Sequence, residues 1–184
     1  MTDAALYGGH RDQNVWRRDM VPQVGDEIIV SCESASDVRV TTAQEVLSGA
    51  IRTGVSPELR KLGFTGSGQV FELVNPDVWL LLGIQKATGG SASQLRFTLN
   101  VAAVPKDKWQ EMIDAGARYP ARPSPNKVYG KWAWWARIGE LMPGGQDFWW
   151  TITDETVPDE LARKVVSACA NYALPALQEQ LQVN

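Results

Sequence analysis

Residues 78–103, VWLLLGIQKATGGSASQLRFTLNVAA, decide the fold of this 184-residue chain. Residues 78–85 form an almost continuous apolar run, and residues 95–103 alternate apolar with polar side chains, as β-strands do. The stretch 87–93 between them is rich in glycine and serine and is too short for the crossover that a parallel pair would need. The pattern therefore predicts two antiparallel strands.

Further elements are expected on both sides of this pair. Thr42 and Glu45 form a capping box that begins a helix, and Gly63 ends it. The segment Pro143-Gly144-Gly145 is typical of a hairpin turn. With strands at 69–73, 131–141 and 148–153 and helices at 105–113 and from 156, the order is α-β-β-β-α-β-β-α. We predict an α+β fold: a five-stranded, meander-like antiparallel sheet with helices packed on one face.

The first 40 residues show no sustained periodicity apart from a possible short strand at 26–32. We therefore predict an N-terminal arm or extension over 1–40 and a single α+β domain over 41–184. A domain of this length can form its own hydrophobic core.

The composition excludes several classes of site. Cys32 and Cys169 lie far apart, and His10 is the only histidine, so neither a disulfide framework nor a zinc ribbon nor a histidine-based triad is expected. We expect no cofactor and no metal. The N-terminus lacks the apolar segment of a signal peptide, and the longest apolar run, 78–84, is too short to span a membrane. These features predict a cytoplasmic protein.

Positive charge is concentrated in residues 105–137. Seven basic and three acidic residues give this segment a charge of +4, whereas the whole chain carries −3. Pro120, Pro123 and Pro125 predict a long loop over 115–130, and we expect residues 105–137 to form a mobile, positively charged surface that is open to trypsin. The sequence pI of about 5.2 argues against a nucleic-acid partner.

Several short motifs occur in a fixed order: Leu62-Gly63-Phe64, Phe71, Gln85-Lys86, Phe97-Thr98-Leu99-Asn100, Arg137-Ile138-Gly139, Trp149-Trp150 and Pro175. In this order they resemble the bacterial family catalogued as domain of unknown function 4304, over about residues 42–182. The resemblance implies a fold and a bacterial origin, and it carries no activity, cofactor or catalytic residue over to this chain. The N-terminal arm and the tryptophan-rich stretch before Gly139 depart from the family pattern.

Two adjacent tryptophan pairs, Trp134/Trp135 and Trp149/Trp150, lie in predicted strands. Since neighbouring side chains of a strand point to opposite faces, at least one indole of each pair must face away from the other. The four rings either cover both faces of the sheet as packing residues or form an exposed platform that binds a ligand or a partner.

Gln85, Asn100 and Arg137 are polar residues within apolar strands, and they converge if their strands are neighbours. They form either a structural hydrogen-bond network or a pocket for a polar or anionic ligand with Arg137 as its anchor. Arg137 should share a strand face with Trp135. The only acids near it in sequence are Glu140 and Asp147.

Catalytic motifs are scarce. Asp154 and Glu155 are adjacent carboxylates, but they are explained as acids that favour a helix N-terminus. We expect a non-enzymatic binding or interaction module of the bacterial cytoplasm, similar to an immunity or accessory protein, that uses a tryptophan-rich sheet face. The alternative is an enzyme or small-ligand carrier with a polar pocket around Gln85, Asn100 and Arg137. The partner would be a protein or a small polar or anionic ligand.

Overall fold

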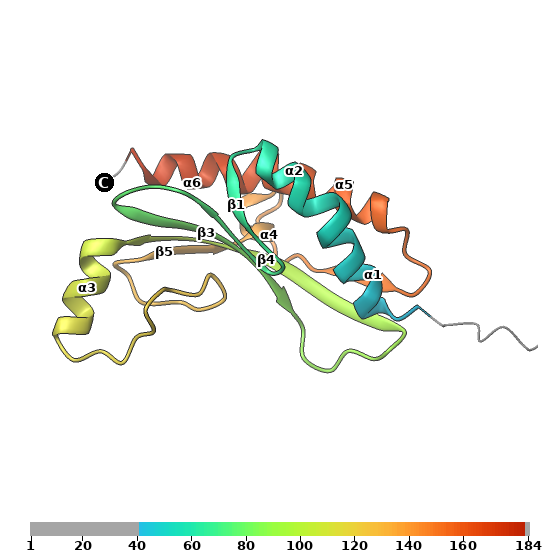
Figure 1. Ribbon diagram of the computed structural model, residues 1–184, viewed down its shortest axis with the longest axis horizontal. Coiled ribbons are helices and arrows are strands. Elements are labelled where there is room, and N and C mark those ends of the chain that lie inside the picture. The colour runs from blue at the N-terminus through green and yellow to red at the C-terminus, as the bar shows by residue number, and fades with distance from the viewer. Residues whose placement is uncertain (1–40, 183–184) are drawn as a thin grey trace, which may run out of the picture. The chain divides into compact units, whose positions relative to one another are not determined.

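The computed structural model describes residues 41–182, so the predicted arm over 1–40 lies outside the described residues. Within 41–182 the α+β class and the antiparallel sheet are confirmed (Figure 1). The strands are β1 (Phe64–Ser67), β2 (Val70–Leu73), β3 (Val78–Lys86), β4 (Gln94–Pro105), β5 (Trp134–Arg137) and β6 (Trp150–Thr153). The helices are α1 (Ala43–Ala50), α2 (Ser56–Lys61), α3 (Lys106–Asp114), α4 (Ile138–Leu141), α5 (Pro158–Ala168) and α6 (Leu174–Gln180), with π-helical turns η1 (Ile51–Val55) and η2 (Cys169–Ala173).

Strands β1 to β5 follow one another across the sheet, each antiparallel to the next. The predicted central pair is present as β3 and β4, whose register runs from Val78 opposite Pro105 to Lys86 opposite Phe97. Strand β1 was not predicted from the sequence. Only the first of its four residues is buried, and it contains Gly66, so it shows no alternation that would predict a strand.

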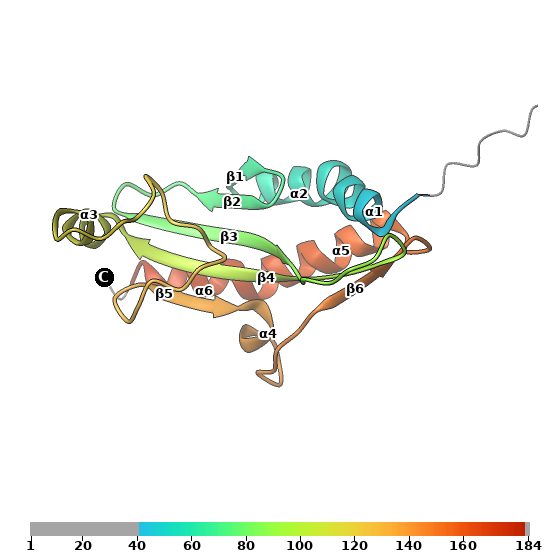
Figure 2. The ribbon, with the colours of Figure 1, turned by 90° about the horizontal axis from the view of Figure 1, so that it is seen from below.

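The predicted hairpin over 131–153 is wrong. β5 and β6 do not pair with each other; both pair with β4, β5 opposite residues 100–103 and β6 opposite residues 94–97 (Figure 2). The long strand β4 therefore offers one edge to two short strands in succession. The chain between them forms α4 and then a turn in which Gly144 and Gly145 adopt positive φ angles. These elements carry the chain along β4 instead of reversing it into a hairpin.

One face of the sheet is covered by α1, α2, α5 and α6 (Figures 1 and 2). The predicted capping box begins this layer: the Glu45 amide donates to Thr42 Oγ1 at 3.2 Å, and the Thr42 amide donates to Glu45 Oε2 at 2.9 Å. Between these helices and the strands lies the main hydrophobic core, which includes the fully buried Phe97 and Leu99 of β4.

Both helical segments that contain an internal proline, Pro57 and Pro175, have a π-helical turn directly before it. In η1 the Ser56 amide donates to the Ile51 carbonyl, five residues earlier, directly before Pro57. In η2 the Leu174 amide donates to the Cys169 carbonyl, directly before Pro175. Because a proline has no amide to donate and crowds the preceding turn, the wider turn lets the helical path continue past it.

The opposite side of the sheet, called the second face below, is half covered. Helix α3 and the segment 115–133 pack there around Trp109, which stacks on Tyr119 at 4.6 Å and meets Tyr129 edge-on at 4.7 Å. The expected mobile loop is therefore packed against the sheet. Pro125 lies so close to β3 that a Cβ on Gly83 would come within 2.5 Å of it, so only glycine fits there. Aromatic residues of this segment attach it to the sheet. They are irregularly spaced in the sequence, so no periodic pattern predicted this packing.

Alanine substitutions at two glycines, Gly54 and Gly49, in the helices that cover the sheet should change stability in opposite directions. A Cβ on Gly54 would lie 2.4 Å from Ala162 Cβ in α5, whereas a Cβ on Gly49 would meet no atom within 4 Å. We expect Gly54→Ala to lower the free energy of unfolding by about 1–3 kcal/mol, because it overpacks a helix contact. Gly49→Ala should raise it by about 0.5–1 kcal/mol through helix propensity. Urea unfolding measures both; equal effects of the two changes would contradict the packing of η1 on α5.

Candidate functional site

The second face brings the predicted polar residues together. Gly83 lies opposite Asn100 in the register of β3 and β4, and Asn100 lies opposite Arg137 in that of β4 and β5. Gln85, two residues after Gly83, projects from the same face. The convergence that the sequence predicted is therefore present, and it follows from the neighbouring positions of β3, β4 and β5.

The tryptophan pairs divide between the two faces. Trp135 and Trp149 lie on the second face, where the guanidinium of Arg137 is 5.8 Å from the Trp135 ring and 5.2 Å from the Trp149 ring. Trp134 packs against the main core on the helix side, and the buried Trp150 stacks on Phe97 at 5.1 Å. Trp134 and Trp150 therefore pack against the core. Only Trp135 and Trp149 can belong to an exposed platform.

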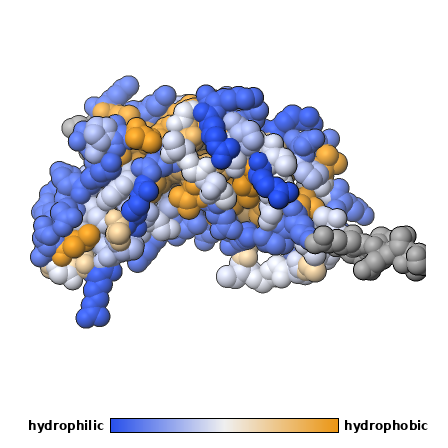
Figure 3. Space-filling view, viewed as in Figure 1, coloured by the Kyte–Doolittle hydropathy of each residue, from blue (hydrophilic) through white to orange (hydrophobic). Residues whose placement is uncertain are grey.

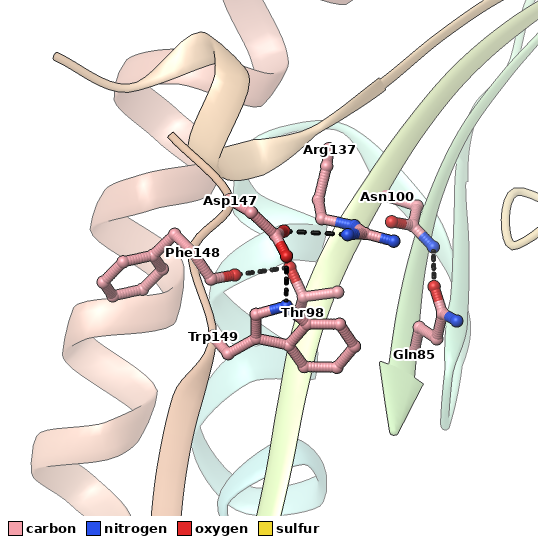
Figure 4. A network of polar contacts seen from close by, with 7 residues as sticks. All are labelled: Gln85, Thr98, Asn100, Arg137, Asp147, Phe148 and Trp149. Carbon is pink, nitrogen blue, oxygen red and sulfur yellow. Dashed lines mark hydrogen bonds and ion pairs between the residues drawn. The ribbon is translucent and has the colours of Figure 1, made fainter. Parts of the chain in front are cut away.

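A single carboxylate holds Arg137 and Trp149 (Figure 4). Asp147 Oδ1 accepts from Arg137 Nη1 at 2.8 Å, and its Oδ2 accepts from Trp149 Nε1 at 2.8 Å. The hydrogen bonds from Arg137 and Trp149 hold the pKa of Asp147 below its usual value. Of the two acids that lie near Arg137 in sequence, Asp147 is therefore its partner.

A second arginine approaches the same indole. Arg96 of β4 places its guanidinium 5.5 Å from the centre of the Trp149 ring. Arg96 is exposed and Trp149 partly buried, so this cation–π contact lies at the surface. Thr98, the next β4 residue on this face, donates its hydroxyl to the Phe148 carbonyl at 2.8 Å and fixes the chain beside Trp149. We call Arg96, Trp135, Arg137, Asp147 and Trp149 the tryptophan–arginine face.

Asn100 forms a separate network below this surface. Its Nδ2 donates to Gln85 Oε1 at 2.7 Å and to Asn126 Oδ1 at 3.0 Å, and the side chain is completely buried. Asn126 in turn donates to the Ile84 carbonyl at 3.3 Å, and Trp135 Nε1 donates to the Pro125 carbonyl at 2.9 Å. These bonds attach the segment 115–133 to β3, β4 and β5, as expected for a structural network.

Two buried polar atoms next to this network have no hydrogen-bond partner among the described residues. They are Asn100 Oδ1, an acceptor, and Arg137 Nε, a donor. Their residues face each other across β4 and β5. Leaving such groups unpaired is costly, so a small polar molecule or a water that reaches both would be stabilised there.

The comparison with known proteins identifies a family. The family described as Domain of unknown function (DUF4304) matches residues 55–179, which is more than half of the chain. The chain belongs to this family. The matched range contains the whole tryptophan–arginine face and the Asn100 network, and it leaves out α1. The resemblance stated from the sequence motifs is confirmed. No curated protein and no solved structure matches the chain.

In this DUF4304 chain the site includes two residues that were not predicted from the sequence, Arg96 and Asn126. Arg96 occupies a polar position of an alternating strand, and this alternation could have placed it on the same face as Asn100. Asn126 lies in the segment 115–133 and comes to the site only through tertiary packing, so no local signal could have identified it. Lys86, the residue after Gln85, lies on the helix side, where its Nζ donates to Gln44 Oε1 at 3.0 Å.

The remaining reactive groups of this DUF4304 chain lie elsewhere. Burial raises the pKa of the Cys169 thiol to about 12, so the thiolate form is suppressed at neutral pH. Asp154 and Glu155 are exposed and precede α5, whose first turn holds Asp159 and Glu160 instead. Among residues 41–182 there is no group of three or more histidine, cysteine, aspartate or glutamate side chains that could hold a metal ion. Nor does any helix in this range combine the length and apolar character of a membrane span.

Proposed function

We propose that this chain is a non-enzymatic binding module of the bacterial cytoplasm that recognises an acidic surface of a protein partner through its tryptophan–arginine face. The observation that carries the proposal is the arrangement around Trp149. Two guanidinium groups lie within 5.5 Å of its ring, and one carboxylate holds both the indole and Arg137.

The chemistry of this face supports a protein partner. Tryptophan and arginine are the residues most often found at the energetic centres of protein interfaces. Trp149 and Arg137 are held in place before binding, so little side-chain entropy remains to be lost. Arg96 and Arg137 outnumber Asp147, which leaves the face positive and suited to an acidic partner. An immunity or accessory protein would use its surface in this way.

The solvent exposure of the side chains favours binding at the surface over binding in a deep ligand pocket. The Asn100 side chain is fully buried beneath Gln85 and Asn126, so a ligand cannot reach it without displacing the segment 115–133. By contrast, the Asp147 side chain is 56% exposed and that of Arg137 is 24% exposed. A partner carboxylate could therefore replace Asp147 at Arg137 without opening the fold.

We expect Arg137→Leu and Trp149→Ala each to abolish partner binding. The Arg137–Asp147 pair is near the surface, so Arg137→Leu should cost less than about 1 kcal/mol of unfolding free energy. The measurement is quantitative capture from a lysate of the source bacterium with immobilised wild type and variants, together with urea unfolding of each. Arg118→Leu, which removes an exposed arginine outside this face, is the matched control and should retain the partner.

The proposal fails if proteins captured by the wild type are retained equally by Arg137→Leu and Trp149→Ala. It fails also if Arg137→Leu unfolds the chain, because Arg137 would then be a structural tie. Loss of the same protein from both variants, with retention by the Arg118→Leu control, supports it.

The second candidate function is a small-ligand carrier or an enzyme with its pocket around Gln85, Asn100 and Arg137. The unpaired Asn100 Oδ1 and Arg137 Nε favour it, because a bound polar group could serve both atoms. A crystal structure of the chain grown with its natural ligands retained would test this candidate. An organic molecule bonded to both atoms would support it, and an ordered water in that position would reduce the site to a hydrated network.

A further inference from the structure

A second site of different chemistry lies on the helix side of the sheet. An open cavity of about 350 Å³ lies between α1, η1 and α2 on one side and the β1–β2 turn and the end of β3 on the other. Its polar lining includes Gln44, Ser48, Arg52, Arg60, Gln69 and Lys86, and we call it the helix–hairpin cavity. Figure 3 shows strongly hydrophilic side chains over α1 and α2 with apolar surface beside them.

The cavity is cationic in a protein whose overall charge is negative. Arg52, Arg60 and Lys86 line it, and no aspartate or glutamate does. None of the three cations forms an ion pair within the described part of the chain. Lys86 donates to an amide oxygen of Gln44 at 3.0 Å, and Arg60 makes one long bond of 3.4 Å to the Gly66 carbonyl. Like charges that line one cavity repel one another, so a bound anion would be stabilised there.

The rest of the lining combines apolar and hydrogen-bonding groups. Ile51 and Arg52 belong to η1, the wide turn that precedes Pro57. The apolar side chains of Leu47 and Ile51 form part of the wall, and the hydroxyl-bearing Ser48 and Ser56 add hydrogen-bonding groups. The volume falls within the range of small-molecule sites, about 300–1,000 Å³.

We propose that the helix–hairpin cavity binds the phosphate group of a small phosphorylated metabolite. The two guanidinium groups match the oxygens of a phosphate, to which arginine donates in a fork, and the Lys86 ammonium adds a third donor. The apolar wall accommodates the organic part of the molecule. This site is independent of the tryptophan–arginine face: Lys86 and Gln85 are neighbours in β3 and project from opposite sides of the sheet.

The test is calorimetric titration of the full-length chain at low salt with inorganic pyrophosphate and with glucose 6-phosphate, using glucose as the uncharged control. We expect saturable binding of both anions at one site per chain, with an affinity that falls as salt is added. Arg60→Gln and Arg52→Gln should each weaken binding about tenfold, the loss expected from removing a charged hydrogen bond. Both arginines are exposed, so both variants should keep the wild-type unfolding midpoint.

Lys61→Gln is the matched control. It removes the same charge from the same helix, but Lys61 pairs with Glu58 and does not line the cavity. It should change the affinity less than about twofold, the effect of a distant screened charge. Trp149→Ala should leave the affinity unchanged, which separates this site from the tryptophan–arginine face.

Three results would overturn the proposal: no saturable heat with either anion up to about 10 mM, beyond the range of a specific site; equal weakening by Arg60→Gln and Lys61→Gln; or unchanged affinity in both arginine variants.

Discussion

Replacing Trp109 with alanine is expected to lower the free energy of unfolding by about 3–5 kcal/mol, the range for truncating a large buried aromatic side chain. Trp109 is 1% exposed and is the centre of the cluster on the second face. Its ring meets Trp79 at 5.7 Å, Tyr119 at 4.6 Å, Tyr129 at 4.7 Å and Trp132 at 6.3 Å. The alanine variant would leave a cavity in contact with all four.

The same change should release the segment 115–133. In the wild type this segment is held by the aromatic cluster, by the Asn126 bonds and by an ion pair between Arg122 and Glu72. We therefore expect trypsin to spare Arg118 and Lys127 in the wild type and to cut there first in Trp109→Ala. Arg122 is not informative, because trypsin does not cut efficiently before Pro123. Urea unfolding and timed proteolysis, followed by mass spectrometry, measure the two effects.

Two further variants test whether the effects of Trp109→Ala on stability and proteolysis come from lost packing. Trp109 Nε1 is buried without a hydrogen-bond partner among the described residues, so Trp109→Phe keeps most of the ring and removes an unsatisfied donor. It should cost much less than the alanine change. Val128→Ala, at a position 58% exposed in the same segment, should leave both stability and proteolysis unchanged. Rapid cleavage of the wild type at Arg118 would show that the segment is mobile, as its prolines had suggested.

The sequence predicted the parts of this fold that depend on local periodicity. The alternation of β4 and the apolar run of β3 identified the central pair, and Thr42 with Glu45 marked the start of α1. Alternation also placed Arg137 on the same side as Trp135 and separated the members of each tryptophan pair. These inferences succeeded because side-chain direction in a strand depends only on position along the chain.

The parts that failed depend on contacts between distant residues. The hairpin was inferred from Pro143-Gly144-Gly145, but β4 is long enough to pair with β5 and β6 in turn, and its edge competes with pairing between them. The helix–hairpin cavity brings Arg52 and Lys86 together from separate elements, and no motif in the sequence links them. The Asn100 network likewise depends on Asn126, whose position is determined by the packing of the segment 115–133.

Gly139→Ala should disrupt the tryptophan–arginine face from outside it. A Cβ on Gly139 would lie 2.1 Å from the Gln146 carbonyl oxygen and 2.5 Å from the Phe148 amide nitrogen. These are backbone atoms, so the added methyl group can be accommodated only by moving the chain that carries Asp147. We expect a loss of about 1–3 kcal/mol in unfolding free energy, typical of overpacking. Asp147→Ala is the matched comparison: it removes the same carboxylate contacts without a backbone clash and should cost less.

The pKa of Asp147 supplies a readout that a general loss of stability would not change. Its hydrogen bonds to Arg137 and Trp149 lower that pKa in the wild type, so their loss in Gly139→Ala should return it toward 3.8. A lowered carboxyl pKa stabilises the fold above the unfolded-state pKa, and this contribution is lost as the pH falls through the folded-state value. The part of the stability difference between the wild type and Gly139→Ala that comes from Asp147 should therefore be present at neutral pH. It should be lost progressively as the pH falls below 3.8. NMR titration of the Asp147 carboxyl group in both proteins measures the shift directly. An unchanged pKa in Gly139→Ala would show that the Arg137–Asp147–Trp149 arrangement does not depend on the close approach of Gly139 to residues 146–148.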